Sequence, residues 1–300
     1  MPLLRIALVL ALLMALAFGA VRLLDPTSVI TATAVKLDSS PAATPVASHA
    51  LVPDLAPGAC VSLPATHSGS GQTVFIDPGH GGLDPGVVGG TAAHPVLEKD
   101  VTLAVASRLS ELLRGAGYRV VMARTQDTTV INLSTSDSVY GSLTASAEHR
   151  DLEARAACAN AAGAAALVSI HFDAFADPSV GGTETFYDAA RTFAPSNKRL
   201  ATDLQLALVA ALGTADRGAW TDDQLAAPTL TSSGSSYNHL IELGPMSAGW
   251  VDAPSEMAGA LVEPLFLTNP AEARVAADTA GQQEIATALE AGLVKFLTGS

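Results

Sequence analysis

Short apolar runs alternate with longer amphipathic stretches along the chain from about residue 70 onward. The apolar runs have the length and flanking residues of buried β-strands, and they lie at residues 73–77, 119–123, 166–170, 240–243 and 260–262. Apolar positions at helical spacing predict α-helices at residues 98–113, 148–160, 195–212 and 282–297. This alternation predicts an α/β fold, in which a single-domain, mostly parallel sheet carries helices on both faces.

Two stretches rich in Ser, Thr and Gly interrupt this alternation, at residues 128–147 and 216–238. Loops of this length in a compact domain usually have a function or are mobile. Ligands of an open parallel sheet bind beyond the carboxyl ends of its strands, where such loops emerge. We therefore expect the functional site at that edge of the sheet.

The first 25 residues differ in character from the rest of the chain. Residues 6–21 form an unbroken uncharged apolar run between Arg5 and Arg22. This run is longer than a typical signal-peptide core and shorter than the roughly 20 residues of a membrane-spanning helix. We expect residues 1–25 to be a signal peptide or an N-terminal membrane anchor, and the protein to be exported to the periplasm, cell wall or extracellular space.

Residues 26–70 have the composition of a linker. Prolines recur among Ala, Thr, Ser and Val without helical or strand periodicity, which favours extended, solvated chain. Residues 71–300 are then the single globular domain. The only cysteines are Cys60, near the end of this linker, and Cys158. In an exported protein the two could form a disulfide, and two unpaired thiols are an equal alternative.

Composition excludes several classes of protein. With 300 residues and 49% hydrophobic content, the chain can bury a sizeable core. Its 29 acidic and 16 basic residues give a net charge of -13, which disfavours nucleic-acid binding because phosphates need basic patches. Two cysteines exclude a disulfide-dense scaffold and a thiolate zinc finger.

Potential metal ligands follow the ends of the predicted strands. His80 lies after the first strand in Asp-Pro-Gly-His-Gly-Gly, His171 ends another, Glu263 ends a third, and Glu98 begins the first helix. Two imidazoles and one carboxylate can bind zinc and leave a fourth position for water, as in hydrolytic sites. A second carboxylate can then accept the proton of that water and pass it to a leaving amine.

Two aspartates lie beside these candidate ligands in the sequence. Asp77 precedes His80 and Asp173 follows His171, so both could orient the ligating imidazoles. Turn formation and strand capping explain the same two residues equally well.

Taken together and in this order, the motifs resemble the type 3 N-acetylmuramoyl-L-alanine amidases, zinc hydrolases of bacterial cell walls. The motifs are Asp-Pro-Gly-His-Gly-Gly, Glu98 at a helix start, an arginine-bearing helix with Arg155, Ser-Ile-His-Phe-Asp-Ala and Val-Glu-Pro-Leu-Phe-Leu-Thr-Asn-Pro. The resemblance covers roughly residues 73–297 and implies a phosphorylase/hydrolase-like fold. It also implies that peptidoglycan is the substrate and that the protein cleaves the amide between the lactyl group of N-acetylmuramic acid and L-alanine.

The resemblance assigns roles to four residues. His80, Glu98 and His171 fall at the zinc-ligand positions of the family, and Glu263 falls at its catalytic glutamate. Glu242, in Leu-Ile-Glu-Leu-Gly, is a rival for the last role. Glu263 is preferred because Phe-Leu-Thr-Asn-Pro follows it, as in the family.

Two other functions stay open at this point. The protein could be another zinc peptidase that acts on stem peptides, or a catalytically degenerate regulator that binds the cell wall. Against the degenerate regulator, all four positions carry side chains able to ligate a metal or to transfer a proton.

Overall fold

The structure is a computed structural model that describes residues 44–45, 54–224, 229–230 and 236–299. The predicted signal peptide or anchor at residues 1–25, and most of the predicted linker, lie outside the described residues. Among the helices that are described, none is both long and apolar enough to cross a lipid bilayer.

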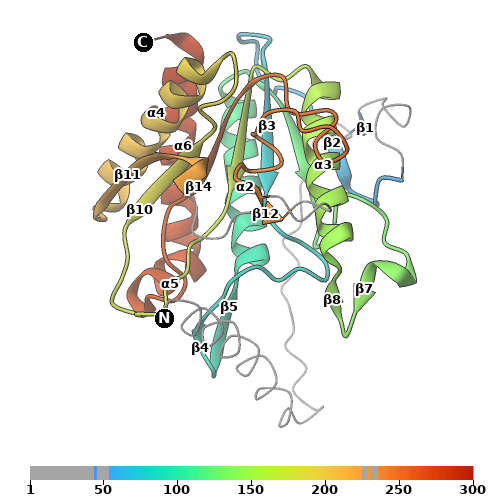
Figure 1. The fold of residues 1–300 in the computed structure, drawn as a ribbon. Helices are drawn as coiled ribbons and strands as arrows, with labels where there is room; N and C mark the ends of the chain where they lie inside the picture. The colour runs from blue at the N-terminus through green and yellow to red at the C-terminus, as the bar shows by residue number, and fades with distance from the viewer. Residues whose placement is uncertain (1–43, 46–53, 225–228, 231–235, 300) are drawn as a thin grey trace. The chain divides into compact units, whose positions relative to one another are not determined.

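An eight-stranded sheet forms the centre of the described domain (Figure 1). Its strands, in spatial order, are β1 (Thr44–Pro45), β2 (Ala59–Leu63), β6 (Arg119–Arg124), β3 (Thr73–Pro78), β9 (Ala166–Ile170), β14 (Ala258–Glu263), β10 (Thr183–Tyr187) and β11 (Asp216–Thr221). The four central strands, from β6 to β14, are mutually parallel, whereas β2 and β10 pair antiparallel with them. The carboxyl ends of β3, β9 and β14 therefore meet at one edge.

Helices cover both faces of this sheet, as predicted. The helices α2 (Glu98–Gly115), α4 (Ala194–Leu212) and α6 (Thr279–Thr298) share one apolar core with Val74 and Ile76 of β3. On the opposite face, α3 (Ala145–Ala162) packs with Phe75. Figure 1 shows α4 and α6 side by side, with α3 well separated from them. Alternate strand residues thus supply two separate cores.

Local sequence signals explain where the helices begin and end. The Thr144 hydroxyl caps α3, and Asn269 and Asp278 cap α5 (Pro270–Ala277) and α6. Gly163 and Gly213, which follow α3 and α4, have φ of 57° and 63°, a conformation that glycine adopts without strain.

Short hairpins and turns connect these elements. The hairpins are β4 (Val88–Thr91) with β5 (His94–Leu97), β7 (Ser138–Val139) with β8 (Ser142–Leu143), and β12 (Thr229–Leu230) with β13 (Ser236–Tyr237). The first two extend from the lower end of the molecule in Figure 1. Single 3-10 turns lie at Thr135–Asp137 and Asp222–Gln224.

The sheet begins earlier in the chain than the sequence predicted. Strand β2 lies inside the range 26–70 that was expected to be linker, and it pairs with β6. Its Cys60 is buried and forms a disulfide with Cys158 of α3, across 98 residues of sequence. The linker prediction is therefore too long at its C-terminal end, and the paired-thiol alternative is the one observed.

One predicted strand is wrong, and β10 and β11 of the central sheet were missed. Residues 240–243 form a turn, in which the N–H groups of Leu243 and Gly244 donate to the Leu240 carbonyl. Ile241 and Leu243 of this turn are buried, but they do not pair with a strand. A short apolar run has the same pattern in a buried turn and in a buried strand, so the sequence alone cannot separate the two. Strand β11 lies in the stretch expected as a loop, and neither it nor β10 is an apolar run.

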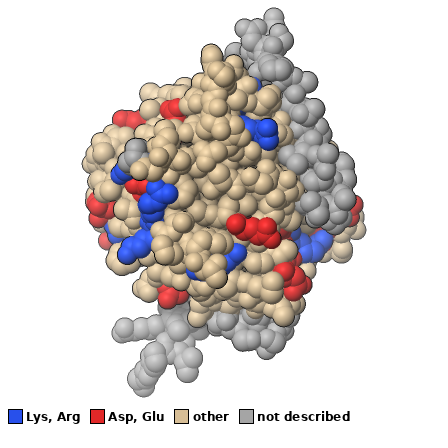
Figure 2. Space-filling view, turned by 90° about the horizontal axis from the view of Figure 1, so that it is seen from above, with Lys and Arg blue, Asp and Glu red and all other residues tan. Residues whose placement is uncertain are grey.

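Charge is distributed thinly over the molecule. The face in Figure 2 shows Lys and Arg in small groups among Asp and Glu, with most of its described surface uncharged. On that face, the described surface has no broad basic area of the kind that binds a phosphate backbone.

Candidate metal centre

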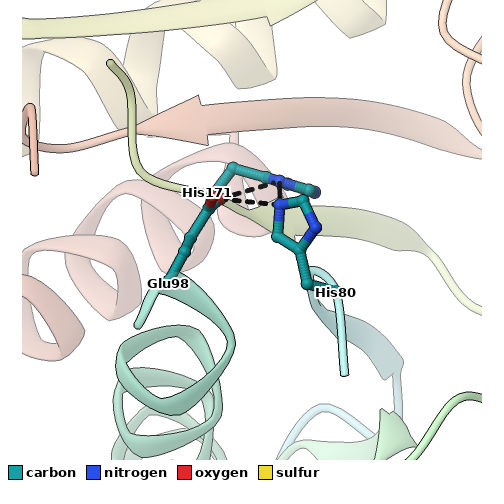
Figure 3. A group of neighbouring side chains, drawn as sticks. All are labelled: His80, Glu98 and His171. Carbon is teal, nitrogen blue, oxygen red and sulfur yellow. Dashed lines mark hydrogen bonds and ion pairs between the residues drawn. The ribbon is translucent and has the colours of Figure 1, made fainter. Parts of the chain in front are cut away.

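Three side chains from distant parts of the sequence converge at the carboxyl edge of the sheet (Figure 3). His80 Nε2 lies 3.0 Å from Glu98 Oε1, and His171 Nδ1 lies 3.1 Å from that oxygen and 3.1 Å from His80 Nε2. Ligands at tetrahedral zinc, about 2 Å from the ion, lie roughly 3.3 Å apart. The three atoms are thus close enough to share one cation.

The backbone around His80 is held in an unusual conformation. His80 has φ of 62°, which is rare for a residue with a side chain, and it lies between Gly79 and Gly81. Two buried arginines bind the carbonyl groups of this loop. Arg124 donates to the Pro78 and Gly79 carbonyls at 2.9 and 2.8 Å, and Arg155 donates to the His80 carbonyl at 2.8 Å.

Arg155 also connects this loop to α3 and β3. It forms ion pairs with Asp77 at 2.6 Å and with Asp151 at 2.8 Å, all three side chains being buried. The second carboxylate oxygen of Asp77 accepts a hydrogen bond from the Ser169 hydroxyl at 2.7 Å. Burial and the neighbouring Arg155 lower the pKa of Arg124 to about 10. Both arginines therefore stabilise the loop by donating hydrogen bonds to its carbonyl groups, and Arg155 also does so through its buried ion pairs.

Glu98 is the first residue of α2 and is almost wholly buried, with a side-chain exposure of 2%. Its two oxygens accept the backbone N–H groups of Val87 at 2.7 Å and Phe172 at 2.9 Å. Burial alone would raise the pKa of Glu98, but hydrogen bonds from His171 and His80 hold it well below its usual range. The carboxylate of this candidate ligand is therefore oriented and ionised.

Each candidate imidazole is also oriented by its surroundings. His171 follows β9, and its backbone N–H donates to the Val262 carbonyl of β14 at 3.0 Å. His80 Nδ1 lies 2.7 Å from Asp84 Oδ2, which leaves Nε2 to face the other candidate ligands. Burial alone would lower the pKa of His80, but contacts with Asp84 and Glu98 raise it to about 9. A carboxylate on the far nitrogen of a metal-binding imidazole is a common arrangement.

Glu263 ends β14 and faces the same space. It lines a groove of about 490 Å³ together with His80, Glu98 and His171. Its buried Oε2 accepts no hydrogen bond from the described residues. Burial and the negative charges of Glu98 and Asp173 raise the pKa of Glu263 well above its usual value. A buried carboxyl group with a free oxygen beside the three candidate ligands can take up and release a proton.

Asp173 lines the same groove and interacts with a different set of residues. Its Oδ1 accepts the N–H of Ala174 at 2.6 Å, and burial together with the neighbouring Glu184 raises its pKa to about 8. Arg217 pairs with Glu184 at 2.8 Å. These three residues line a second groove, of about 840 Å³, that continues past Glu263 to the half-exposed Trp220.

The rival Glu242 is on the α3 face of the sheet. It is buried, and it lines a smaller cavity of about 220 Å³ whose wall also includes His80 and His171. Burial and the neighbouring Asp77 raise the pKa of Glu242 well above its usual value. Unlike Glu263, it does not line the groove that contains Glu98.

The structure brings together the sequence-predicted residues but changes the partners of two. Asp77 bonds to Arg155 and Ser169, and Asp173 interacts with Glu184 and the N–H of Ala174. It is Asp84 that contacts the ring of His80. Sequence reasoning missed Asp84, Arg124 and Glu184. Asp84 follows His80 by four residues in a glycine-rich loop, a spacing that could have indicated it, whereas Arg124 and Glu184 have no comparable local signal.

Sequence comparisons with known proteins identify the relatives of this chain. A sequence profile described as N-acetylmuramoyl-L-alanine amidase matches residues 74–295. The N-acetylmuramoyl-L-alanine amidase LytC of Bacillus subtilis (strain 168) is 31% identical over 226 residues, which are 75% of this chain and 36% of LytC. The germination-specific N-acetylmuramoyl-L-alanine amidase of the same organism is 31% identical over 229 residues, 76% of this chain and 81% of the relative.

Solved structures share the fold. The CwlD amidase from Clostridioides difficile, in complex with the GerS lipoprotein, superposes with a TM-score of 0.60 at 25% identity and covers 76% of this chain and 100% of the CwlD chain. An N-acetylmuramoyl-L-alanine amidase from Clostridium difficile 630 has a TM-score of 0.56 at 28% identity, over 77% of this chain and 98% of that one. The fold and the resemblance predicted from sequence are confirmed, and the chain belongs to the N-acetylmuramoyl-L-alanine amidase family.

Proposed function

We propose that this protein is a zinc-dependent, exported N-acetylmuramoyl-L-alanine amidase. It hydrolyses the amide between the lactyl group of N-acetylmuramic acid and the L-alanine of the stem peptide. One observation carries the proposal: His80 Nε2, Glu98 Oε1 and His171 Nδ1 converge beside the free carboxyl oxygen of Glu263.

The donor set of this centre suits zinc. Two imidazole nitrogens and one carboxylate oxygen form a three-ligand set that zinc uses in hydrolytic sites, with a further position left for water or substrate. When bound, the ion would polarise the amide carbonyl and lower the pKa of water. The residues around it fix the ligands beforehand, since Asp84 holds His80 and two backbone N–H groups hold Glu98.

Glu263 moves the proton in this proposal. Its carboxylate accepts a proton from the water that attacks the amide carbon, and it then gives a proton to the nitrogen of L-alanine as the C–N bond breaks. The products are the free lactyl carboxylate and a peptide with a free amino terminus. A raised pKa lets Glu263 retain the proton between the two steps.

The groove beyond Glu263 supplies a surface for the substrate. Phe175 and Trp220 line it with exposures of 53% and 46%, and Arg217 lies between acidic side chains. A protein of net charge -13 gains no long-range attraction to an anionic polymer, so recognition is local to this groove.

Location follows from the substrate. Peptidoglycan lies outside the cytoplasmic membrane, so the protein acts in the periplasm, cell wall or extracellular space, and residues 6–21 direct it there or anchor it. Fractionation of cells that produce the full chain tests this, because recovery in the cytoplasm alone would contradict export.

Mass spectrometry of digested peptidoglycan tests the activity. The full chain, loaded with zinc, is incubated with purified cell wall, and the released fragments are identified. Amidase activity gives stem peptides that begin with L-alanine and glycan strands with a free lactyl carboxylate. Peptides shortened at their carboxyl end would favour another zinc peptidase, and intact wall after incubation with zinc would favour a non-catalytic wall-binding regulator.

A further inference from the structure

A second group of metal-binding side chains lies at the other edge of the sheet. Strands β10 and β11 are parallel neighbours, and each is followed directly by an aspartate, Asp188 and Asp222. Because β10 runs antiparallel to β14, these carboxyl ends lie opposite the edge that carries Glu263. Two buried carboxylates therefore meet at this second edge, because the carboxyl ends of parallel neighbouring strands lie together.

His239 completes this second group. Its Nδ1 lies 2.8 Å from Asp188 Oδ2 and 3.3 Å from Asp222 Oδ1. The three atoms all lie within 4.8 Å of one another, as do those of His80, Glu98 and His171. His239 comes from the segment between β11 and β14, so three separate stretches of chain contribute one donor each.

Backbone groups orient both carboxylates toward the histidine. Asp188 Oδ1 accepts the N–H groups of Ala190 at 2.7 Å and Arg191 at 2.9 Å. Asp222 Oδ2 accepts the N–H of Leu240 at 2.9 Å. One oxygen of each carboxylate is thus held by the backbone, and the other points at His239. Ligating carboxylates in proteins are fixed by such outer contacts.

The carboxylate oxygen of Asp188 that faces His239 is buried but accepts no hydrogen bond from the described residues. Asp188 is 0% exposed, and among the described residues no hydrogen bond reaches its Oδ2, although His239 Nδ1 is 2.8 Å away. The nearby guanidinium of Arg191 instead donates to the carbonyls of Leu243, Gly244 and Ser255. His239 is thus the contact of this oxygen, and a buried carboxylate oxygen that accepts no hydrogen bond costs free energy unless a cation compensates it.

The neighbouring carboxylates also repel each other. Asp188 Oδ2 and Asp222 Oδ1 lie 2.8 and 3.3 Å from the same nitrogen, His239 Nδ1, so two carboxylates are held close together. A divalent ion between the carboxylates would remove this repulsion and satisfy the free oxygen of Asp188.

We propose that Asp188 Oδ2, Asp222 Oδ1 and His239 Nδ1 bind a second divalent transition-metal ion, such as Zn²⁺. One imidazole nitrogen and two carboxylate oxygens form a donor set that such ions accept, whereas Ca²⁺ and Mg²⁺ prefer oxygen donors throughout. The side chain of His239 is 26% exposed, so water can reach the ion and supply a further ligand.

The ion would fasten one segment of the chain to the sheet. His239 is followed by Leu240, Ile241 and Glu242, which line the cavity shared with His80 and His171. The proposed site therefore holds in place a wall of the cavity beside the first centre, without contributing a ligand to it. This inference does not depend on which bond the enzyme cleaves.

Zinc content of the full chain tests this proposal. Metal-depleted protein is incubated with excess Zn²⁺, freed of unbound ion and analysed by inductively coupled plasma mass spectrometry. We expect two zinc ions per chain in the wild type, one in Asp222→Asn and one in His80→Gln. The control Asp223→Asn, at a neighbouring exposed residue, should retain two. A wild type with one ion, which His80→Gln loses and Asp222→Asn keeps, would overturn the second site.

A measurement on the wild type alone keeps the proposal testable if Asp222→Asn fails to fold. Crystals of the zinc-loaded protein are examined by anomalous scattering at the zinc edge. A peak between Asp188, Asp222 and His239 supports the site, and its absence from crystals that show a peak at His80 and His171 refutes it. The zinc content of His80→Gln also separates this proposal from the amidase proposal, because one retained ion supports the second site whatever the activity.

Discussion

Among the described carboxyl groups that line the groove of the candidate metal centre, Glu263 alone has a buried oxygen without a hydrogen-bond partner. Glu242 also has a buried oxygen without a partner, but it lines the cavity on the α3 face instead. Asp84 and Glu98 are held by imidazoles and backbone N–H groups, and Asp173 interacts with Glu184. Groups that already hold strong partners are poorly suited to exchange protons during a reaction. At the scale of single residues, this distinction assigns proton transfer to Glu263.

Replacement of Glu263 tests this assignment. We expect Glu263→Gln to lower kcat by about 10²- to 10⁴-fold, because the amide cannot accept the proton, while the zinc content stays that of the wild type. The matched control is Glu242→Gln, which changes the other carboxyl group with a buried, unpartnered oxygen and should retain most activity. Loss of activity in Glu242→Gln with an active Glu263→Gln would transfer the role to Glu242.

Gly86 shows how closely the backbone approaches the candidate ligands. It has φ of 62°, and a Cβ atom there would lie 2.5 Å from Glu98 Oε2 and 2.6 Å from His80 Cδ2. We expect Gly86→Ala to lower zinc affinity about 10-fold or more, since both ligands would have to move. Competition with a chelator of known affinity measures this effect.

Gly141 is the matched control for that substitution. It also has a positive φ, 84°, but a Cβ atom there meets nothing within 4 Å. Gly141→Ala should therefore cost stability alone, about 1 kcal/mol, and leave zinc affinity unchanged. Equal losses of affinity in the two variants would show that backbone strain, and not contact with the ligands, is responsible.

At the scale of secondary structure, the elements that the sequence predicted correctly bury apolar residues in one or both of the two cores. Strands β3 and β9 are apolar over most of their length, and α2 and α6 place their apolar residues on one face. Strand β10 is as fully buried, but its Thr183, Glu184 and Thr185 do not form an apolar run. Their polar groups are satisfied by Gln205, Arg217 and Thr214, contacts that no local pattern reveals.

The positions of the site residues at strand ends were predictable from topology. The arginines that hold the His80 loop in place were not. The candidate ligands His80 and His171 follow β3 and β9, and the proton-transfer residue Glu263 ends β14; the carboxyl ends of these strands meet at one edge, so topology alone brings the three together. Arg124 and Arg155 reach the His80 loop from other elements, and their partners are backbone carbonyls that any sequence has. Such contacts depend on three-dimensional packing.

The disulfide joins the outer strand β2 to α3, and we expect it to stabilise the domain. Replacement of Cys60 and Cys158 by Ala should lower the free energy of unfolding by roughly 2–4 kcal/mol, because the bond closes a loop of 98 residues in the unfolded chain. Denaturant unfolding of the full chain measures this difference. Dithiothreitol should destabilise the wild type and leave the double variant unchanged, and an unaffected wild type would contradict the prediction.

At the scale of the whole molecule, the sheet separates two sets of potential metal ligands. One set lies at the carboxyl ends of β3 and β9 beside two grooves, and the other lies at the carboxyl ends of β10 and β11. The first has a free carboxyl group next to it and room for a polymer, as hydrolysis requires. The second contacts the segment that closes one wall of the cavity behind the first.

The most direct test is to measure hydrolysis of purified peptidoglycan by metal-depleted full chain as Zn²⁺ is added back. The account predicts that stem peptides with a free L-alanine amino terminus are absent without metal. They should appear as zinc binds in the wild type, and stay absent at the same zinc concentrations in His171→Ala. Undiminished release of these peptides by the metal-free protein, or by His171→Ala, would contradict the account.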